Sequence, residues 1–265
     1  IRRSAARALG RQLTLLETTI TALVELLKDK ESYVQRSAAL ALGRQLTLLE
    51  ITITALIELF NNRYISVQRS AVNALGKQLT LLEIIITALI EVLKHKDSNV
   101  RRSATRALGR QLTLLETIIT ALIELLKDEE SYVQRSTALA LGRQLTLLET
   151  TITALIELFN NRYISVQRST VNALGKQLTL LETIITALIK VLKHKDSDVQ
   201  RSTTRSLGKQ LTLLEITITA LIEVLKDKDS KVQSFTTLAI GKQLTLLEII
   251  ITALIEVLKD KDSKV

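Results

Sequence analysis

Residue types that usually carry out chemistry are scarce in this chain. It has no cysteine and only two histidines, His95 and His194, which stand in identical Lys-His-Lys-Asp segments. The sequence contains no Ser-His-acid combination, no glycine-rich phosphate loop and no pair of histidines at metal-ligand spacing. Two isolated histidines offer too few ligands for a metal ion, so we expect both in solvent. The sequence therefore predicts no catalytic site, no metal site and no cofactor.

The polar chemistry that remains is charge, and it recurs every 33 residues. One arginine position forms a set that we call the basic ladder, and its members are Arg3, Arg36, Arg69, Arg102, Arg135, Arg168 and Arg201. A second basic residue follows eight positions later, as at Arg11 and Arg44, and a third lies between them at Arg7 and Arg106. Spacings of four residues keep these side chains on one side of a helix.

A second set is acidic and rich in threonine, with members four residues apart. We call it the acidic ladder, and its members are Glu17, Thr21, Glu25, Glu50, Thr54, Glu58, Glu116, Thr120 and Glu124. These glutamates recur too regularly to form one catalytic pair. The pattern indicates a surface that is repeated from one helix to the next.

The ladders follow a repeat that organises the whole chain. The segment Gly-(Arg/Lys)-Gln-Leu-Thr-Leu-Leu-Glu begins at each of the eight glycines, from Gly10 to Gly241, always 33 residues apart. A fixed period of this length is typical of a solenoid, in which each repeat packs only on its neighbours. Hydrophobic residues make up 46% of the chain and aromatic residues 3%, so the core is expected to be aliphatic.

Each repeat predicts a first helix, which we call helix A. In the second repeat, Ser32 is the expected N-cap, with Gln35 completing a capping-box pattern. The expected buried positions are Val34, Ala38, Ala41 and Leu42. The helix should end within a few residues of Gly43. That glycine either allows a neighbouring helix to approach closely or adopts the left-handed conformation that stops a helix.

A second helix, helix B, follows in each repeat. Thr47 as N-cap with Glu50 at the third helical position is a capping box. The expected apolar stripe consists of Leu48, Leu49, Ile53, Leu56, Ile57 and Phe60. Two helices in each 33 residues predict an all-α fold, an α-solenoid of eight helical hairpins spanning residues 1–265 as a single array.

A longer period lies over the short one. Residues 1–99 and 100–198 differ at about eleven positions, among them Asn99 and Asp198, and a partial third block covers 199–265. This indicates recent duplication of a three-repeat block. Because the pattern is cut at both ends, we expect a fragment of a longer chain.

One segment carries a resemblance to a known family. Residues 100–109, Val-Arg-Arg-Ser-Ala-Thr-Arg-Ala-Leu-Gly, are followed at 120–128 by Thr-Ala-Leu-Ile-Glu-Leu-Leu-Lys-Asp. This pair resembles the short HEAT-like repeat of the phycobilisome-lyase type, over the whole chain. The resemblance implies a curved, right-handed superhelix with helix B on the concave face, and a scaffold that binds proteins. No residue here matches a chromophore-handling motif, so the lyase activity is not carried over.

The ladders leave several interpretations open. Both faces can simply be solvated, with some arginines paired to neighbouring carboxylates. Alternatively, the acidic ladder, with Tyr64 and Tyr163 in loops beside it, binds a basic or helical protein segment. Nucleic acid on the basic ladder is the least favoured partner, because acidic residues are abundant and no aromatic residues interleave for base stacking.

The remaining expectations concern the setting of the chain. The net charge of +9 permits an anionic partner without requiring one. No apolar window is long enough for a membrane span and no signal peptide is visible, so we expect no membrane partner and a cytoplasmic location. Self-association through uncapped ends is a further possibility. The alternative function is the ligand-sensing region of a larger signalling NTPase.

Overall fold

The computed structural model describes residues 1–11, 17–45, 49–78, 83–111, 116–144, 149–177, 182–209, 215–227, 229–241 and 255. These residues form helices and contain no β-strand. The A helices are α1 (Arg2–Leu9), α3 (Ser32–Leu42), α5 (Ile65–Leu75), α7 (Ser98–Leu108), α9 (Ser131–Leu141), α11 (Ile164–Leu174), α13 (Ser197–Leu207) and α15 (Ser230–Gly241). The B helices are α2 (Glu17–Leu26), α4 (Glu50–Glu58), α6 (Glu83–Val92), α8 (Glu116–Leu125), α10 (Glu149–Glu157), α12 (Glu182–Leu192) and α14 (Glu215–Val224). Short 3-10 turns, η1 (Leu59–Asn61) and η2 (Leu158–Asn160), extend α4 and α10.

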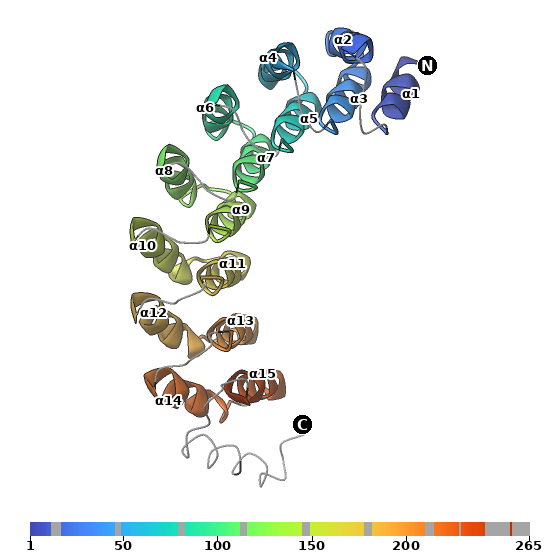
Figure 1. The fold of residues 1–265 in the computed structure, drawn as a ribbon. Helices are drawn as coiled ribbons and strands as arrows, with labels where there is room; N and C mark the ends of the chain where they lie inside the picture. Colours follow the sequence, from blue (N-terminus) through green and yellow to red (C-terminus); the bar gives the residue numbers. More distant parts are fainter. Residues whose placement is uncertain are drawn as a thin grey trace. The chain divides into compact units, whose positions relative to one another are not determined.

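The chain consists of two compact halves, Ile1–Ala140 and Leu141–Val265, which we call the N-terminal and C-terminal halves. In each half the A helices form one row and the B helices another (Figure 1). The predicted hairpin repeat is confirmed for the first seven repeats. The second helix of the eighth repeat lies outside the described residues, apart from Ile255.

The core lies between the two rows and is aliphatic, as expected. In the second repeat, the four positions predicted for helix A are all buried, and so are Ile53, Leu56 and Phe60 of helix B. Two positions of the predicted stripe differ, because Leu49 is exposed and Ile57 is only half-buried. Leu48 lies outside the described residues.

Glycine at the end of each A helix allows close approach. Gly43 is the C-cap of α3 and has an ordinary negative φ of −68°, so the left-handed alternative is wrong here. A Cβ atom added at Gly43 would lie 2.5 Å from Cα of Ala74 in the next A helix. Gly10 meets Ala41 in the same way, at 2.8 Å. Neighbouring A helices therefore pack backbone against backbone.

Close packing of the A row bends the N-terminal half. Neighbouring B helices touch far less than neighbouring A helices do, and the A row follows the inner side of the bend in this half (Figure 1). The expectation that helix B lies on the concave side is therefore wrong for the N-terminal half. Glycine and alanine shorten the distance between A helices, whereas bulkier side chains separate the B helices.

Helix starts differ from the expected caps by one or two residues. Ser98 is the first residue of α7, and the N-cap is Asp97, whose Oδ1 accepts the backbone N–H groups of Asn99 and Val100 at 2.9 and 3.2 Å. Asp196 caps α13 by accepting the backbone N–H of Val199 at 3.0 Å. An aspartate carboxylate accepts these bonds more strongly than a serine hydroxyl.

The caps of α3 and α4 lack a side-chain bond. The N-cap of α3 is Glu31 rather than Ser32, and it makes no side-chain cap bond. Helix α4 begins at Glu50 with Leu49 as N-cap, so Glu50 is not at the third helical position. The predicted N-cap Thr47 lies outside the described residues.

Candidate binding surfaces

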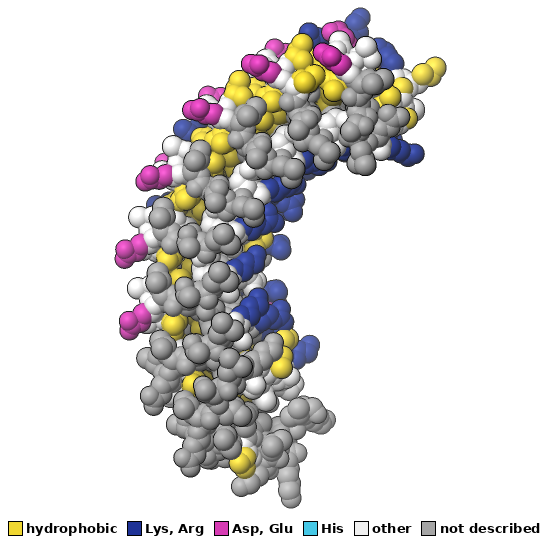
Figure 2. All heavy atoms as spheres, viewed as in Figure 1, with side chains coloured by type: hydrophobic (Ala, Val, Ile, Leu, Met, Phe, Trp, Pro, Cys, Tyr) yellow, Lys and Arg dark blue, Asp and Glu magenta, His cyan; other side chains and the backbone are white. Residues whose placement is uncertain are grey.

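The acidic ladder lies on the exposed side of the B helices. All nine predicted residues are exposed, and Figure 2 shows acidic side chains along the margin formed by the B helices of the N-terminal half. Two ion pairs are found among the described residues of this half, Arg2–Asp29 and Arg101–Asp128, and both use loop aspartates. The carboxylates of the acidic ladder are therefore available to an outside cation.

The threonine hydroxyls of this ladder are less able to donate hydrogen bonds to a partner than the sequence suggests. The hydroxyl of Thr21 donates to the carbonyl oxygen of Glu17 at 3.0 Å, and Thr54 and Thr120 repeat this bond with Glu50 and Glu116. This bond to the preceding turn occupies the only donor of each hydroxyl. The threonines therefore present methyl groups and lone pairs, and the charge of this face comes from the glutamates alone.

A groove opens between α6 and α8 because the B helices pack loosely. Its volume is about 360 Å³, and its apolar wall includes Ile90, Leu93 and Leu125. Glu124 of the acidic ladder also lines it. In the C-terminal half, a groove of about 690 Å³ between α10 and α12 is lined by Ile156, Phe159 and Glu182. Both grooves therefore combine apolar side chains with charges of both signs: Glu124 lies with Lys94, Lys96 and Lys127 in the first, and Glu182 with Lys190 in the second.

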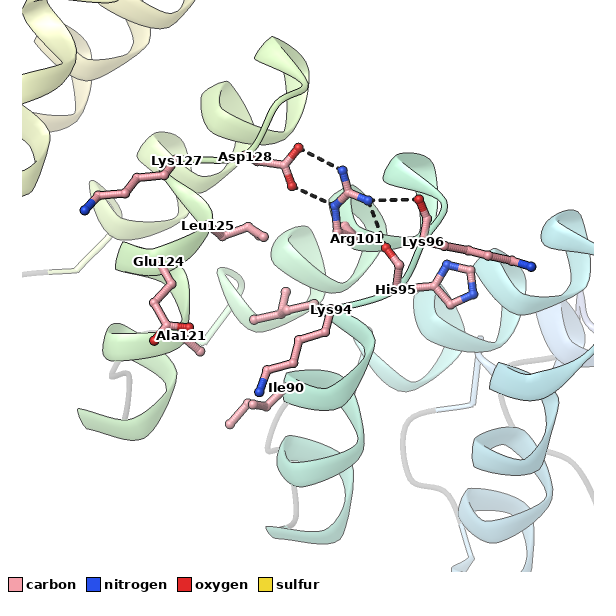
Figure 3. A pocket seen from close by; sticks show the side chains of 11 residues that line it. Ile90, Lys94, His95, Lys96, Arg101, Ala121, Glu124, Leu125, Lys127 and Asp128 are labelled. Carbon is pink, nitrogen blue, oxygen red and sulfur yellow. Dashed lines mark hydrogen bonds and ion pairs between the residues drawn. The ribbon is translucent and has the colours of Figure 1, made fainter.

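Arg101 forms one wall of the α6–α8 groove and holds its loops together (Figure 3). Its guanidinium donates to both carboxylate oxygens of Asp128, at 2.6 and 2.8 Å, and to the carbonyl oxygens of His95 and Lys96, at 2.8 and 3.0 Å. The bond to Asp128 raises the pKa of Arg101, a group that is already fully charged. Arg101 is therefore a structural residue.

The two histidines have a structural role as well. Nδ1 of His95 accepts the backbone N–H of Asp97 at 3.0 Å, and His194 accepts that of Asp196 at the same distance. Both imidazoles are half-buried, so the expectation that they are free in solvent is wrong. The described residues hold no cluster of three or more groups that could bind a metal ion.

Tyr64 and Tyr163 are less available than the sequence suggests. The guanidinium of Arg63 lies over the ring of Tyr64 at 4.6 Å, and Arg162 covers Tyr163 at 4.7 Å. Tyr64 is also the N-cap residue of α5. Each ring already has a cation on one face, so a partner would meet an Arg-Tyr pair.

The basic ladder lies on the exposed side of the A helices. Most of its arginines are exposed, whereas Arg102 and Arg201 are half-buried. In the N-terminal half these side chains line the inner side of the bend (Figure 2). The basic residue eight positions later also holds the stack together, since Arg44 donates to the carbonyl oxygen of Gly10 at 3.0 Å and Arg110 to that of Gly76 at 3.1 Å.

Aromatic rings do stand among these arginines, contrary to the sequence analysis. The guanidinium of Arg3 lies 5.7 Å from the ring centre of Tyr33, and that of Arg102 lies 5.6 Å from Tyr132. The signal was present in the sequence, because Tyr33 precedes Arg36 by three residues and so shares its helix face. The pairing of arginine with tyrosine is not visible in the sequence, because the two partners in each pair belong to different repeats.

Two rows of short helices, joined as hairpins and carrying opposite charge on their outer sides, define a helical-repeat protein. A family model described as HEAT repeats matches residues 1–76, 51–142 and 86–175, which together cover more than half of the chain. The chain belongs to the HEAT repeat family. No curated protein matches it.

One solved structure supports the fold. An engineered protein from the Northeast Structural Genomics Consortium is 24% identical with a TM-score of 0.53, over 98% of this chain and 81% of that one. A second, 25% identical over 86% of this chain and 98% of that one, has a TM-score of 0.46. Among the described residues, no helix is both long and apolar enough to cross a bilayer.

Proposed function

We propose that this chain is a non-catalytic scaffold whose B helices bind a basic, amphipathic protein segment. The supporting observation is the exposed row of glutamates on the B helices, whose carboxylates make no ion pair within the described residues of the N-terminal half. The apolar side chains of Ile90 and Leu125 lie beside one of them, Glu124, in the groove between α6 and α8. HEAT repeat proteins are typically non-catalytic scaffolds, and membership of that family supports the scaffold part of the proposal.

The chemistry of the B face selects the class of partner. Exposed apolar side chains accompany the glutamates, with Ile51 and Ile84 exposed by 65% and 50% directly after Glu50 and Glu83. A segment that presents apolar residues on one side and lysine or arginine beside them matches this surface. The repetition of the face suits a partner that contacts several repeats at once.

A labelled amphipathic helical peptide of leucine and lysine tests this proposal. We expect the double variant Glu50→Gln, Glu58→Gln to bind it about fivefold more weakly, because each exposed charge pair contributes up to about 1 kcal/mol. The matched control is Glu31→Gln, Glu129→Gln, which removes the same charge from exposed loop positions and should bind as the original chain does. Equal weakening by both variants would show attraction to net charge rather than to this face.

Two other ideas from the sequence remain proposals. Self-association through apolar ends agrees with the exposure of Ile1 and of Leu238, which is 54% exposed on α15. Within the described residues, no contact favours the sensor region of a signalling NTPase over a simple scaffold.

A further inference from the structure

The outer side of the A helices in the N-terminal half is a second charged surface, separate from the proposed B-face site. We call it the basic face; it consists of the ladder residues Arg3, Arg36, Arg69, Arg102 and Arg135, with Arg7 and Arg106 on the same helices and Arg11, Arg44, Lys77 and Arg110 just after the helix ends. The sequences of α1, α3, α5, α7 and α9 contain no aspartate or glutamate. The acidic residues of this half lie on the B helices and in the loops. Their abundance therefore does not argue against an anionic partner here.

Positive charges are crowded on this face. The pKa of Arg102 is lowered by its partial burial and by the positive charges of Arg106, Arg135 and Arg69. The pKa of Lys77 is lowered by partial burial of its ammonium group and by Arg44 and Arg110. Cations that repel one another across successive repeats are each stabilised by an anion that runs along the row.

The duplicated block provides an internal comparison. Asp198 in the C-terminal half stands where Asn99 stands in the N-terminal half. Arg168 forms an ion pair with Asp198 at 3.2 Å, and Arg201 also pairs with it. One carboxylate thus pairs with two ladder arginines in the C-terminal half and lowers their combined charge by one. Asn99 leaves the corresponding positions, Arg69 and Arg102, without that partner.

The side chains on the basic face fit phosphates better than they fit a folded protein. Protein interfaces concentrate apolar and aromatic anchors at their centre. On the described part of the basic face, the exposed large apolar side chain is Tyr33, and the guanidinium of Arg3 already lies over its ring. The exposed side chains of Leu49, Ile51 and Ile84 belong to the B side. Because arginine covers the rings of Tyr33 and Tyr132, bases cannot readily stack on those faces. The rings instead hold the guanidinium groups of Arg3 and Arg102 in place.

We propose that the basic face of the N-terminal half binds nucleic acid along its phosphodiester backbone, without reading base sequence. Arginine donates paired N–H groups to phosphate oxygens. With helices roughly 9–10 Å apart, five A helices span about 40 Å, which is slightly more than one turn of duplex DNA. Contacts of this kind release counterions, so the affinity should fall steeply as salt is added.

The test measures binding of labelled DNA duplex and of labelled single strand by anisotropy over a series of salt concentrations. We expect a linear fall of log K with log salt. The variant Arg36→Ala, Arg69→Ala should lower the magnitude of that slope by about two, since each phosphate contact contributes about 0.9. The control Lys28→Ala, Lys30→Ala removes the same charge from exposed loop positions and should keep the slope.

A single substitution sharpens the test. Asn99→Asp places in the N-terminal half the carboxylate that Asp198 supplies in the C-terminal half, so we expect weaker DNA binding and a slope smaller by about one. Circular dichroism melting verifies that each variant remains folded. Absence of salt-dependent DNA binding would overturn the proposal, as would an equal loss in the lysine control. Sodium polyglutamate binding as tightly as DNA, with the same dependence on Arg36 and Arg69, would instead identify an acidic protein as the partner.

Discussion

At the scale of single residues, three buried threonines mark where the repeat departs from an ideal core. Thr52 occupies on α4 the position that Ile85 and Ile118 occupy on α6 and α8, and all three are buried. Within the described residues, the hydroxyl of Thr52 has no hydrogen-bond partner, and Thr151 and Thr217 repeat this situation. A buried hydroxyl without a partner costs about 1–3 kcal/mol.

Replacing this hydroxyl should stabilise the protein. We expect Thr52→Val to raise the free energy of unfolding by about 1 kcal/mol, because valine keeps the shape and removes the unpaired group. Urea unfolding followed by circular dichroism measures the change. Thr54→Val is the control, because Thr54 is exposed and bonded to Glu50 and should show no comparable gain. A lower free energy of unfolding in Thr52→Val would show that the Thr52 hydroxyl stabilises the fold, contrary to this explanation.

Aspartate caps make one helix start sensitive to acid. Backbone N–H groups of Lys231 and Val232, with the Ser197 hydroxyl, lower the pKa of Asp229, the bond to Lys231 having the largest effect. A carboxyl group whose pKa is lower in the folded state stabilises folding above its unfolded pKa of about 3.9. That contribution is lost as the pH falls through the folded value. We therefore expect α15 to lose protection below about pH 4.

Amide hydrogen exchange at Lys231 and Val232 over an acid series measures this loss. Asp229→Asn should remove the pH dependence below the ordinary aspartate pKa while retaining an N-cap. If the wild-type chain and Asp229→Asn show the same acid profile, the cap does not control the start of α15.

At the scale of elements, the glycine at the end of each A helix sets the distance to the next. A Cβ added at Gly76 would lie 2.7 Å from Cα of Ala107, which is closer than side-chain atoms approach. We expect Gly76→Ala to lower the free energy of unfolding by about 1–3 kcal/mol through overpacking. Chemical denaturation of the purified protein gives the value.

Two further variants identify the cause. Gly76→Ala combined with Ala107→Gly should lose less than the sum of the two single changes, because the second change removes one of the clashing groups. Gly241→Ala should be neutral or stabilising, because no described atom lies within 4 Å of a Cβ at that position and alanine favours the helix. Strict additivity at Gly76 and Ala107 would contradict the close-contact explanation.

The elements also show which features were predictable from sequence. The two helices of each of the first seven repeats, and the end of their A helices at glycine, follow from the 33-residue period and were predicted correctly. The helix starts were not, because Ser98 is preceded by Asp97, and two adjacent cap residues cannot be ranked by pattern alone. The role of Gly43 could not be decided either, since both a close approach and a left-handed turn select glycine.

At the scale of the whole molecule, the charged ladders were predictable but their surroundings were not. Regular spacing placed Arg36 and Glu50 on exposed helix faces, and the structure agrees. Contacts between residues far apart in the sequence stayed hidden, among them Arg101 with Asp128 and Arg102 with Tyr132, because hydrophobic periodicity does not show which side chains meet when the helices stack. The difference between Asn99 and Asp198 was visible in the sequence, but its effect on two arginines needs the stacked helices.

The unequal packing of the two rows has a mechanical consequence. Within each half, the A helices meet where a glycine lies against an alanine or, at Gly175, against Ser206, so that row can hardly be compressed or stretched. The B helices touch little and leave grooves of about 360 and 690 Å³. When a half bends, the spacing of its A helices therefore stays nearly constant, and the spacing of its B helices changes instead. A segment bound between two B helices would then restrict this change of spacing and make that half more rigid.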